Sequence, residues 1–318
     1  MRWGGTHPRN AGCTVGGLPD RKDLLMSRLL IIDGHAYAYR AFHAIRELRS
    51  PAGQATNAIF GFVKMLSKMR AALEPTHLIV VWDGGLSAER TAALPGYKAQ
   101  RPEMPESLEA QLDEMQDYLQ AAGIASYCGQ GVEADDYIAC LTRQAVAAGM
   151  QVVIASSDKD FMQLVRPGVG LLNPNDKTET IWTATEVKAK TGVEPSQIVD
   201  WLSLVGDSVD NIPGVPGVGV KTAAALLGEF WSVQGLYDRL DEVRSERQRE
   251  ALRLAAGDVR RNQRLVRLKD DLPCEFSPGE LEPGTRDEAR LAELYRKWGF
   301  RTMLAELESS NSRQGALL

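Results

Sequence analysis

Uninterrupted apolar runs recur in the first half of the chain and predict buried β-strands. Residues 29–32, 78–82 and 152–155 are rich in Leu, Ile and Val and contain no charged side chain. Such runs are typical of parallel strands with helices on both faces, whereas a half-exposed strand alternates apolar and polar residues. Weaker runs predict three more strands, at 124–127, 169–172 and 180–182.

Amphipathic stretches lie between these runs and predict helices. Apolar positions spaced by three or four residues, the helical pattern, cover 36–48, 55–73, 105–122 and about 132–148. The alternation of strand and helix predicts an α/β fold with a mostly parallel sheet. It stops near residue 185, and the chain is then predicted to be helical, with charged faces, as far as residue 300.

This pattern divides the chain into four predicted parts. An α/β core covers 26–184, a helical subdomain covers 185–305, and a tail covers 306–318, of which the polar residues 309–318 are expected to be disordered. Residues 1–25 are rich in Gly, Pro and Arg and lack the apolar stretch of a secretory signal. We expect this first segment to be disordered, or untranslated if Met26 is the start.

Three of the predicted strands lead into an aspartate. Asp33, Asp83 and Asp158 follow apolar runs, and parallel strands place their carboxyl ends along one edge, where open α/β sheets bind ligands. Carboxylates about 4 Å apart repel by roughly 4 kcal/mol per pair at an effective dielectric constant near 20. Such a cluster needs protonation or bound cations. One such Asp alone could equally be the N-cap of the next helix.

Further acidic residues accompany these strand ends. They are Glu133, Asp135, Asp136, Asp160, Asp207 and Asp210. Oxygen ligands without sulfur or imidazole suit hard cations, so we expect two ions of Mg²⁺ or Mn²⁺. Because adjacent residues do not both face one site, either Asp135 or Asp136 could instead be a helix N-cap.

Composition restricts the other possibilities. The 318-residue chain has four scattered cysteines and no CxxC pair, which argues against a zinc site or a disulfide framework and fits a reducing cytoplasm. With four histidines, a histidine-based nucleophile relay is not expected. No apolar run reaches membrane-spanning length. The net charge of −5 disfavours a nucleic-acid partner at first sight, but two divalent ions would return about +4 to the site.

The segment 84–105 is long for a connection without periodicity, and such loops are usually functional or disordered. Its candidate side chains are Arg90, Tyr97, Lys98 and Arg101. We predict that Lys98 and Arg101 lie over a phosphate, with Arg as a two-pronged clamp and Lys as a point charge. Tyr97, and less so Tyr39, could stack on an unpaired base or belong to the core. Arg40 could contact phosphate or pair with an acid.

A glycine-rich loop precedes a run of strongly helix-forming residues that begins near residue 223. Its candidate residues are Gly214, Gly217, Gly219, Lys221 and Thr222. It is not a phosphate-binding P-loop, because Val220 separates Gly219 from Lys221, and it does not match the dinucleotide fingerprint. Backbone N–H groups at a helix start attract phosphate and could hold a DNA backbone without reading its sequence. A simple interhelical turn remains the alternative.

These motifs together resemble the 5′-nuclease (flap endonuclease) superfamily, in particular the 5′→3′ exonuclease domain at the N-terminus of bacterial DNA polymerase I. The resemblance covers about residues 28–305. The matching motifs are Ile32-Asp33-Gly34-His35 with Tyr39-Arg40, Val81-Trp82-Asp83, Gly96-Tyr97-Lys98-Ala99 with Arg101, Glu133-Ala134-Asp135-Asp136, Asp158-Lys159-Asp160, and Gly206-Asp207 through Asp210 to Gly214.

The resemblance implies a PIN-like α/β core, a helical arch at 84–105 over the site, and a helix–hairpin–helix type motif that tracks duplex DNA. It implies that Asp33, Asp83, Glu133 and Asp135 hold the first metal ion. Asp158, Asp160 and Asp210 would hold the second, with Asp136 and Asp207 as outer or shared ligands. It also implies a K⁺ ion on the backbone carbonyls of residues 214–219.

The implied function is a structure-specific 5′→3′ exonuclease or flap endonuclease that hydrolyses DNA by a two-metal-ion mechanism in replication and repair. Its substrates would be DNA with 5′ ends, flaps or nicks, or RNA–DNA hybrids. We expect a cytoplasmic monomer that acts on the bacterial nucleoid, either as a stand-alone nuclease or as an excised polymerase domain.

Three other functions compete with this hypothesis. A haloacid-dehalogenase-like phosphatase needs Asp-x-Asp, and this chain has Asp33-Gly34-His35; a PIN-type toxin ribonuclease would be much shorter. A catalytically weak DNA-binding protein on the same fold would be expected to lose acids of the second metal group, and all are present. After Asp83 the family often has an aromatic-Arg-His-Glu run, of which only Arg90 is kept, so specificity at the arch stays open.

Overall fold

The computed structural model describes residues 27–175, 180–274 and 276–315. Its centre is a six-stranded sheet in the order β3-β2-β1-β4-β5-β6, with every pair parallel except β5–β6. The strands are β1 (Arg28–Asp33), β2 (His77–Trp82), β3 (Ala125–Cys128), β4 (Gln151–Ala155), β5 (Val169–Leu172) and β6 (Ile181–Trp182). The predicted α/β fold with a mostly parallel sheet is confirmed.

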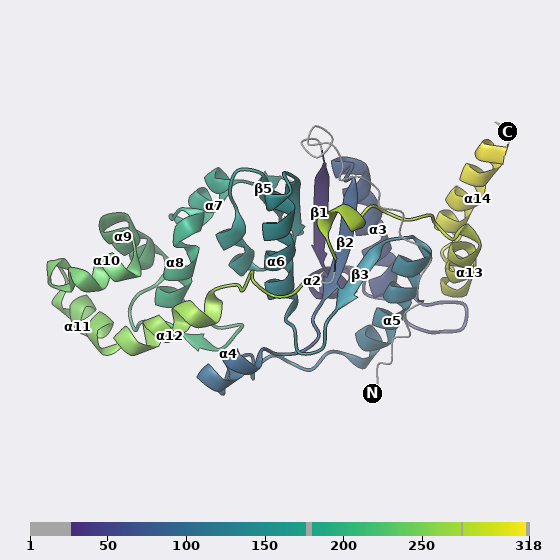
Figure 1. Ribbon diagram of the computed structural model, residues 1–318. Helices are drawn as coiled ribbons and strands as arrows, with labels where there is room; N and C mark the ends of the chain where they lie inside the picture. The colour runs from purple at the N-terminus through teal and green to yellow at the C-terminus, as the bar shows by residue number, and fades with distance from the viewer. Residues whose placement is uncertain (1–26, 176–179, 275, 316–318) are drawn as a thin grey trace.

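Helices cover both faces of the sheet (Figure 1). One face carries α2 (Gly34–Ala44), α3 (Asn57–Leu73) and α5 (Glu106–Ala121), and the other carries α6 (Ala134–Ala147) and α8 (Ile198–Val205). Leu30 and Ile32 of β1 belong to the first core layer, and Leu29 and Ile31 belong to the second. Because successive side chains of a strand point to opposite faces, an unbroken apolar run supplies both layers.

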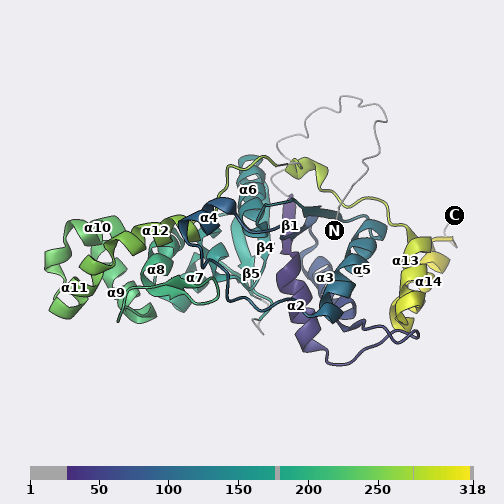
Figure 2. The same cartoon turned by 90° about the horizontal axis from the view of Figure 1, so that it is seen from below.

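The helices after β6 lie at two opposite ends of the molecule (Figures 1 and 2). One group sits beside α8: α7 (Ala184–Thr191), α9 (Val220–Phe230), α10 (Val233–Asp238), α11 (Glu246–Leu254) and α12 (Ala256–Val266). At the other end, α13 (Glu288–Trp298) and α14 (Arg301–Gly315) return to the core.

The prediction of one helical unit over 185–305 is therefore wrong in its last part. Leu291, Tyr295 and Trp298 are buried in the core layer of α3 and α5, and the Trp298 indole N–H donates to Glu114 at 2.9 Å. The apolar pattern shows that a helix buries one face, but it does not show against which surface. The predicted tail at 306–318 does not form a separate part over residues 306–315, because these residues continue α14. Residues 1–25 and 316–318 lie outside the described residues.

A small two-stranded ribbon connects α8 to α9. It consists of β7 (Gly206–Asp207) and β8 (Ile212–Pro213), and the turn between them carries Asp210. A Cβ atom on Gly214 would lie 2.1 Å from the Val205 carbonyl oxygen, so only glycine fits there. The predicted DNA contact at Gly214 is thus better explained by packing against the end of α8. The helix, ribbon and helix form the expected helix–hairpin–helix arrangement.

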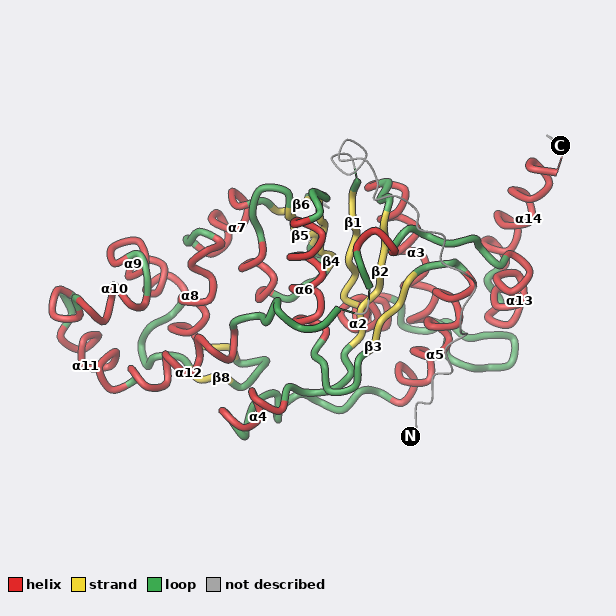
Figure 3. Tube along the Cα trace, in the orientation of Figure 1, coloured by secondary structure: helices red, strands yellow, loops and turns green. Residues whose placement is uncertain are grey.

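The segment 84–105 runs along the edge where β1 and β2 end (Figure 3), and it holds one short helix, α4 (Ala88–Ala93). Arg90 ties it to the core. Its guanidinium donates to both carboxylate oxygens of Asp136 at 2.7 Å, and to the backbone carbonyls of Leu265 and Arg267. With 3% of its surface exposed, Arg90 is not available to DNA. The predicted DNA contact at Arg90 is wrong, because this arginine neutralises a buried acid.

We predict that Arg90→Met lowers the free energy of unfolding by about 3–5 kcal/mol, because Asp136 would remain buried without its partner. Urea denaturation measures the loss. Arg90→Met combined with Asp136→Leu should recover more than half of it, and Arg253→Met on exposed α11 serves as the control. Unchanged stability in Arg90→Met, together with weaker DNA binding, would contradict the structural role.

Candidate active site

The carboxyl ends of the parallel strands bring distant acids into one cavity. Asp33 is the last residue of β1, Asp83 follows β2 directly, and Asp158 follows β4 after two serines. They line a cavity of about 610 Å³ together with Asp135 from the first turn of α6 and with Asp207 and Asp210 from the ribbon. Six of the nine predicted metal-binding acids thus face a common space.

Burial and mutual repulsion disfavour the charged form of these acids. Burial raises the pKa of Asp33 to about 6, although hydrogen bonds from Ala36 and Ser156 oppose the rise. Burial and then neighbouring carboxylates also raise the pKa of Asp135, where Asp158 adds to the effect, and of Asp158, where Asp210 does. The cavity is therefore short of positive charge.

Asp160 lies behind this cavity wall. It is buried, and the carboxylates of Asp158, Asp210 and Asp207 add to burial in raising its pKa. Its Oδ1 atom has no hydrogen-bond donor among the described residues. A buried carboxylate oxygen without a partner is costly, and it is the kind of atom that a cation would satisfy.

The carboxylate of Glu133 is bound by groups of the segment 84–105. It accepts hydrogen bonds from Lys98 Nζ at 2.8 Å, from the Tyr97 hydroxyl at 3.0 Å and from the Ser87 N–H at 2.8 Å. Burial alone would raise the pKa of Glu133, but Lys98 and Arg90 hold it below its usual value. Neither Glu133 nor Asp136 lines the cavity. The predicted place of Glu133 in the first metal group is therefore not supported by its position, whereas the position of Asp136 is compatible with the predicted outer role.

Lys98 and Arg101 bring positive charge to the cavity. Lys98 has a left-handed backbone (φ +55°), and its Nζ lies 2.8 Å from Glu133, 3.7 Å from Asp135 and 4.0 Å from Asp210. Burial alone would lower the pKa of Lys98, but these carboxylates raise it well above its usual value. Arg101 donates to Asp210 at 2.7 Å while about a third of its side chain stays exposed. Both predicted cations are therefore at the site.

Two predicted DNA contacts, Tyr97 and Arg40, have partners within the protein. Tyr97 is 4% exposed, so its ring belongs to the core and is not a platform for a base. Arg40 donates to Asn175. In the hairpin, by contrast, Gly217, Gly219 and Lys221 are exposed and Thr222 is half-buried. Gly219 starts α9 without a side-chain cap, which leaves first-turn N–H groups open to a ligand.

Two cavity residues, His35 and Lys159, were not selected from the sequence, whereas Tyr39, a candidate for base stacking, also lines the cavity. The Asp83 N–H donates to His35 Nδ1 at 3.1 Å. The Nζ of Lys159 lies 3.0 Å from Asp207. Their spacing could have indicated their position. His35 and Tyr39 follow Asp33 by two and six residues, and Lys159 lies between two of the predicted metal-binding acids.

The donor set fits hard divalent cations, because six aspartates and no cysteine line the cavity. Within the described ranges, no three acidic, histidine or cysteine side chains already converge on one point as a ready-made cage. Lys98 and Arg101 instead lie among the carboxylates. In the same ranges, no helix combines the length and apolar character needed to cross a bilayer.

Comparison with known families matches the chain in two adjoining parts. Residues 28–192 match the N-terminal resolvase-like domain of 5′-3′ exonucleases, and residues 193–289 match their C-terminal SAM fold. The second match ends where α13 begins, which agrees with the return of α13 and α14 to the core.

Individual proteins show the same relationship. The 5′-3′ exonuclease of Aquifex aeolicus is 37% identical over 284 residues, 89% of this chain and 96% of that protein. DNA polymerase I of Bacillus caldotenax is 36% identical over 292 residues, 91% of this chain but only 33% of the polymerase. A solved structure of T5 5′-exonuclease with bound zinc has a TM-score of 0.63 at 25% identity and covers 75% of this chain and 89% of its own. This chain belongs to the 5′-3′ exonuclease family.

Proposed function

We propose that this chain is a metal-dependent 5′→3′ exonuclease and flap endonuclease that hydrolyses phosphodiester bonds of DNA. The observation that carries the proposal is the single cavity lined by Asp33, Asp83, Asp135, Asp158, Asp207 and Asp210, with Lys98 and Arg101 among them. The Aquifex relative that the chain spans almost entirely is named as a 5′-3′ exonuclease, and T5 5′-exonuclease has been solved with bound divalent zinc.

The acids divide by position into two groups that would hold the ions. Asp33, Asp83 and Asp135 come from β1, β2 and α6, whereas Asp158, Asp207 and Asp210 come from the loop after β4 and from the ribbon. Asp160 lies behind the second group. Two Mg²⁺ or Mn²⁺ ions bound there would supply an activated water and stabilise the departing oxygen. Glu133 and Asp136 support the site through Lys98 and Arg90.

Lys98 and Arg101 would position the phosphodiester. The Lys98 ammonium is fixed by Glu133 within a buried setting, so it offers a stationary positive charge. The Arg101 guanidinium is partly exposed and can exchange its Asp210 oxygen for a phosphate oxygen. His35 keeps Asp83 in place by accepting its backbone N–H.

The hairpin would bind the backbone of the DNA duplex at a place outside the cavity. The exposed Gly217, Gly219 and Lys221, with the uncapped start of α9, present N–H groups and a positive charge to a phosphate backbone. We also propose a K⁺ ion on carbonyls of residues 214–219. DNA with 5′ ends, flaps or nicks, or an RNA–DNA hybrid, would be the substrate of a monomeric cytoplasmic enzyme.

An inactive DNA-binding protein is the competing function. Asp158, Asp207 and Asp210 all line the cavity, and a protein that had lost its chemistry would have no need to keep these mutually repelling carboxylates together. The geometry thus favours the enzyme.

We predict cleavage of a 5′-labelled flap and of a nicked duplex in Mg²⁺ or Mn²⁺, and none in EDTA. A labelled single strand run alongside measures the dependence on structure. Asp158→Asn combined with Asp160→Asn should lower the rate at least about 100-fold, because the second group of acids loses its charge. Cleavage by this double variant at the normal rate, with unchanged metal titration, would refute the assignment.

We predict that Asp33→Asn stabilises the metal-free protein near pH 7.5. Unfolded Asp33 ionises near its usual pKa of 3.8, whereas the folded pKa is about 6. The folded state therefore loses up to about 3 kcal/mol relative to the unfolded state as pH rises from about 4 to about 6, and loses nothing below pH 4. The variant escapes this loss, so thermal melts in EDTA should show a higher Tm at pH 7.5 and no difference near pH 4.

The same melts contain their controls. Asp113→Asn, on the exposed side of α5, should leave the Tm unchanged. Added Mg²⁺ should stabilise the wild type more than Asp33→Asn. An Asp33→Asn protein that is less stable than the wild type at pH 7.5 in EDTA would show that Asp33 is not electrostatically strained.

We predict that Lys221→Gln weakens binding to duplex DNA a few-fold and lowers the salt slope by about one, with little change in kcat, because one phosphate contact is lost. Fluorescence anisotropy in EDTA at several salt concentrations measures this effect. Lys68→Gln, an exposed lysine on α3 that lines neither cavity, is the matched control. Equal effects of both substitutions would argue against a specific hairpin contact.

A further inference from the structure

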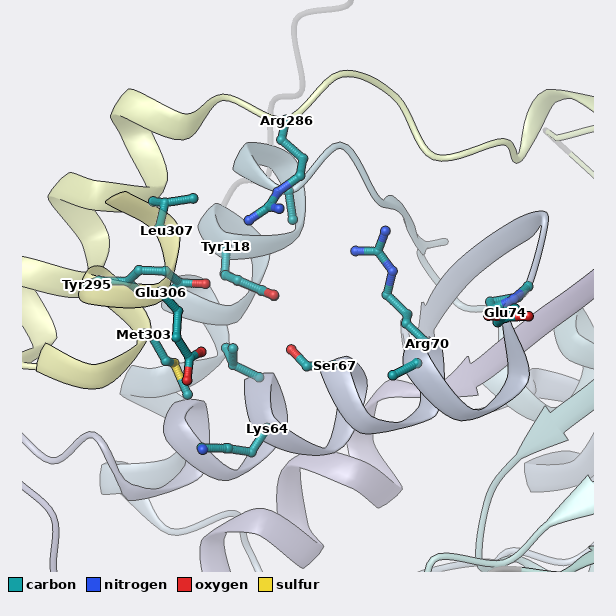
Figure 4. Close-up of a pocket in the computed structure, with 14 residues that line it drawn as sticks. Lys64, Ser67, Arg70, Glu74, Tyr118, Arg286, Tyr295, Met303, Glu306 and Leu307 are labelled. Atoms are coloured by element: carbon teal, nitrogen blue, oxygen red, sulfur yellow. The ribbon is translucent and has the colours of Figure 1, made fainter. Parts of the chain in front are cut away.

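A second cavity lies away from the carboxylates, between α3, α5, α13 and α14 (Figure 4). Its volume is about 580 Å³. It includes Glu74 and Pro75, which precede the amino end of β2, whereas Asp83 follows the carboxyl end of that strand. Six strand residues at about 3.3 Å each put roughly 20 Å between the two ends. The second cavity therefore opens on a different surface from the metal-binding edge.

Two arginines face this cavity without an acidic partner. Arg70 projects from α3 and Arg286 from the stretch before α13, and Figure 4 shows both guanidinium groups reaching into the same space. Within the described ranges, neither guanidinium makes a hydrogen bond or ion pair. Burial raises the pKa of Tyr118, and both arginines oppose that rise, so both lie near its hydroxyl. The two positive charges therefore act on the same hydroxyl group.

Hydroxyl groups lie between the arginines. Tyr118 shares hydrogen bonds with Ser67 and Tyr295. Two unpaired guanidinium groups beside hydroxyl donors are the arrangement that recognises phosphate, because each guanidinium can give two parallel hydrogen bonds.

The remaining lining sets the size and the charge of the ligand. Val63, Met303 and Leu307 supply an apolar part, and Lys64 adds a third cation against the two acids Glu74 and Glu306. This cavity is thus positive by one charge in a chain whose net charge is −5. Its volume is within the usual range for small-molecule sites, about 300–1,000 Å³.

We propose that this cavity binds a small phosphate-bearing molecule of about the size of a nucleoside monophosphate, with its phosphate between Arg70 and Arg286. The apolar wall would receive the uncharged part of the molecule. The site is independent of the nuclease reaction, so it stands whether or not the metal cavity performs the proposed chemistry.

Calorimetric titration of the full chain in EDTA tests the proposal, with inorganic phosphate, deoxyadenosine 5′-monophosphate and deoxyadenosine as probes. Without metal, the carboxylate cavity repels anions and does not compete. We expect saturable binding of one monophosphate per chain, weaker or equal binding of inorganic phosphate, and at least ten-fold weaker binding of deoxyadenosine. Binding of deoxyadenosine as tight as the monophosphate, or no saturable binding of either phosphate probe, overturns the proposal.

Substitutions locate the site. Arg70→Gln with Arg286→Gln should weaken monophosphate binding by about ten-fold or more, as expected for lost charge-assisted hydrogen bonds. Ala71→Glu should also abolish binding, because it places a carboxylate in the cavity while both arginines remain. Ala72→Glu, on the exposed neighbour that does not line the cavity, is the matched control. Unchanged affinity in either of the first two variants, or equal losses in Ala71→Glu and Ala72→Glu, would contradict the assignment.

Discussion

Parallel strands covered on both faces leave Asp33, Asp83 and Asp158 no room to separate. The register of β1 with β2 and β4 fixes where each strand ends, so repulsion between the carboxylates cannot be relieved without breaking the sheet. Burial first, and then this repulsion, raise the pKa of Asp33, Asp135 and Asp158. The rest of the site can be understood as a response to this excess of negative charge.

The protein supplies part of the balancing charge itself. Lys98, Arg101 and Lys159 each approach at least one carboxylate of the cavity, and Arg90 neutralises Asp136 below it. The segment 84–105 is also hydrogen-bonded to the ribbon, since the Lys98 N–H donates to the Asp210 carbonyl and Asn211 donates to Gly96. Cations, acids and hairpin are therefore held in one framework, which connects the proposed DNA-binding hairpin to the cavity. Divalent ions would balance the negative charge that these cations leave in the cavity.

The sequence was informative wherever local pattern determines structure. The apolar runs located the six strands of the main sheet. The parallel topology then implied that Asp33 and Asp158, 125 positions apart, would meet. The roles of Arg90, Tyr97, Glu133 and Asp136 could not be read in the same way, because burial depends on which helix packs over a side chain. Arg90 matches a family position and has the charge of a DNA contact, yet α6 and the residues after α12 enclose it. The packing of α13 and α14 against the α/β core could not be predicted for the same reason. An amphipathic pattern shows that a helix buries one face, but not which surface it packs against.

The most direct test of this account is the number of protons that metal binding displaces. Mn²⁺ titrated into the protein by calorimetry at pH 6, in buffers of different ionisation enthalpy, measures that number. Asp33, with a pKa of about 6, is about half protonated at this pH in the metal-free fold, and the pKa values of Asp135 and Asp158 are raised as well. Two bound ions, proton release at pH 6 and much smaller release at pH 8 are therefore predicted. Absence of Mn²⁺ binding, or binding whose heat is independent of buffer at pH 6, would show that the carboxylates do not form one strained, cation-binding cluster.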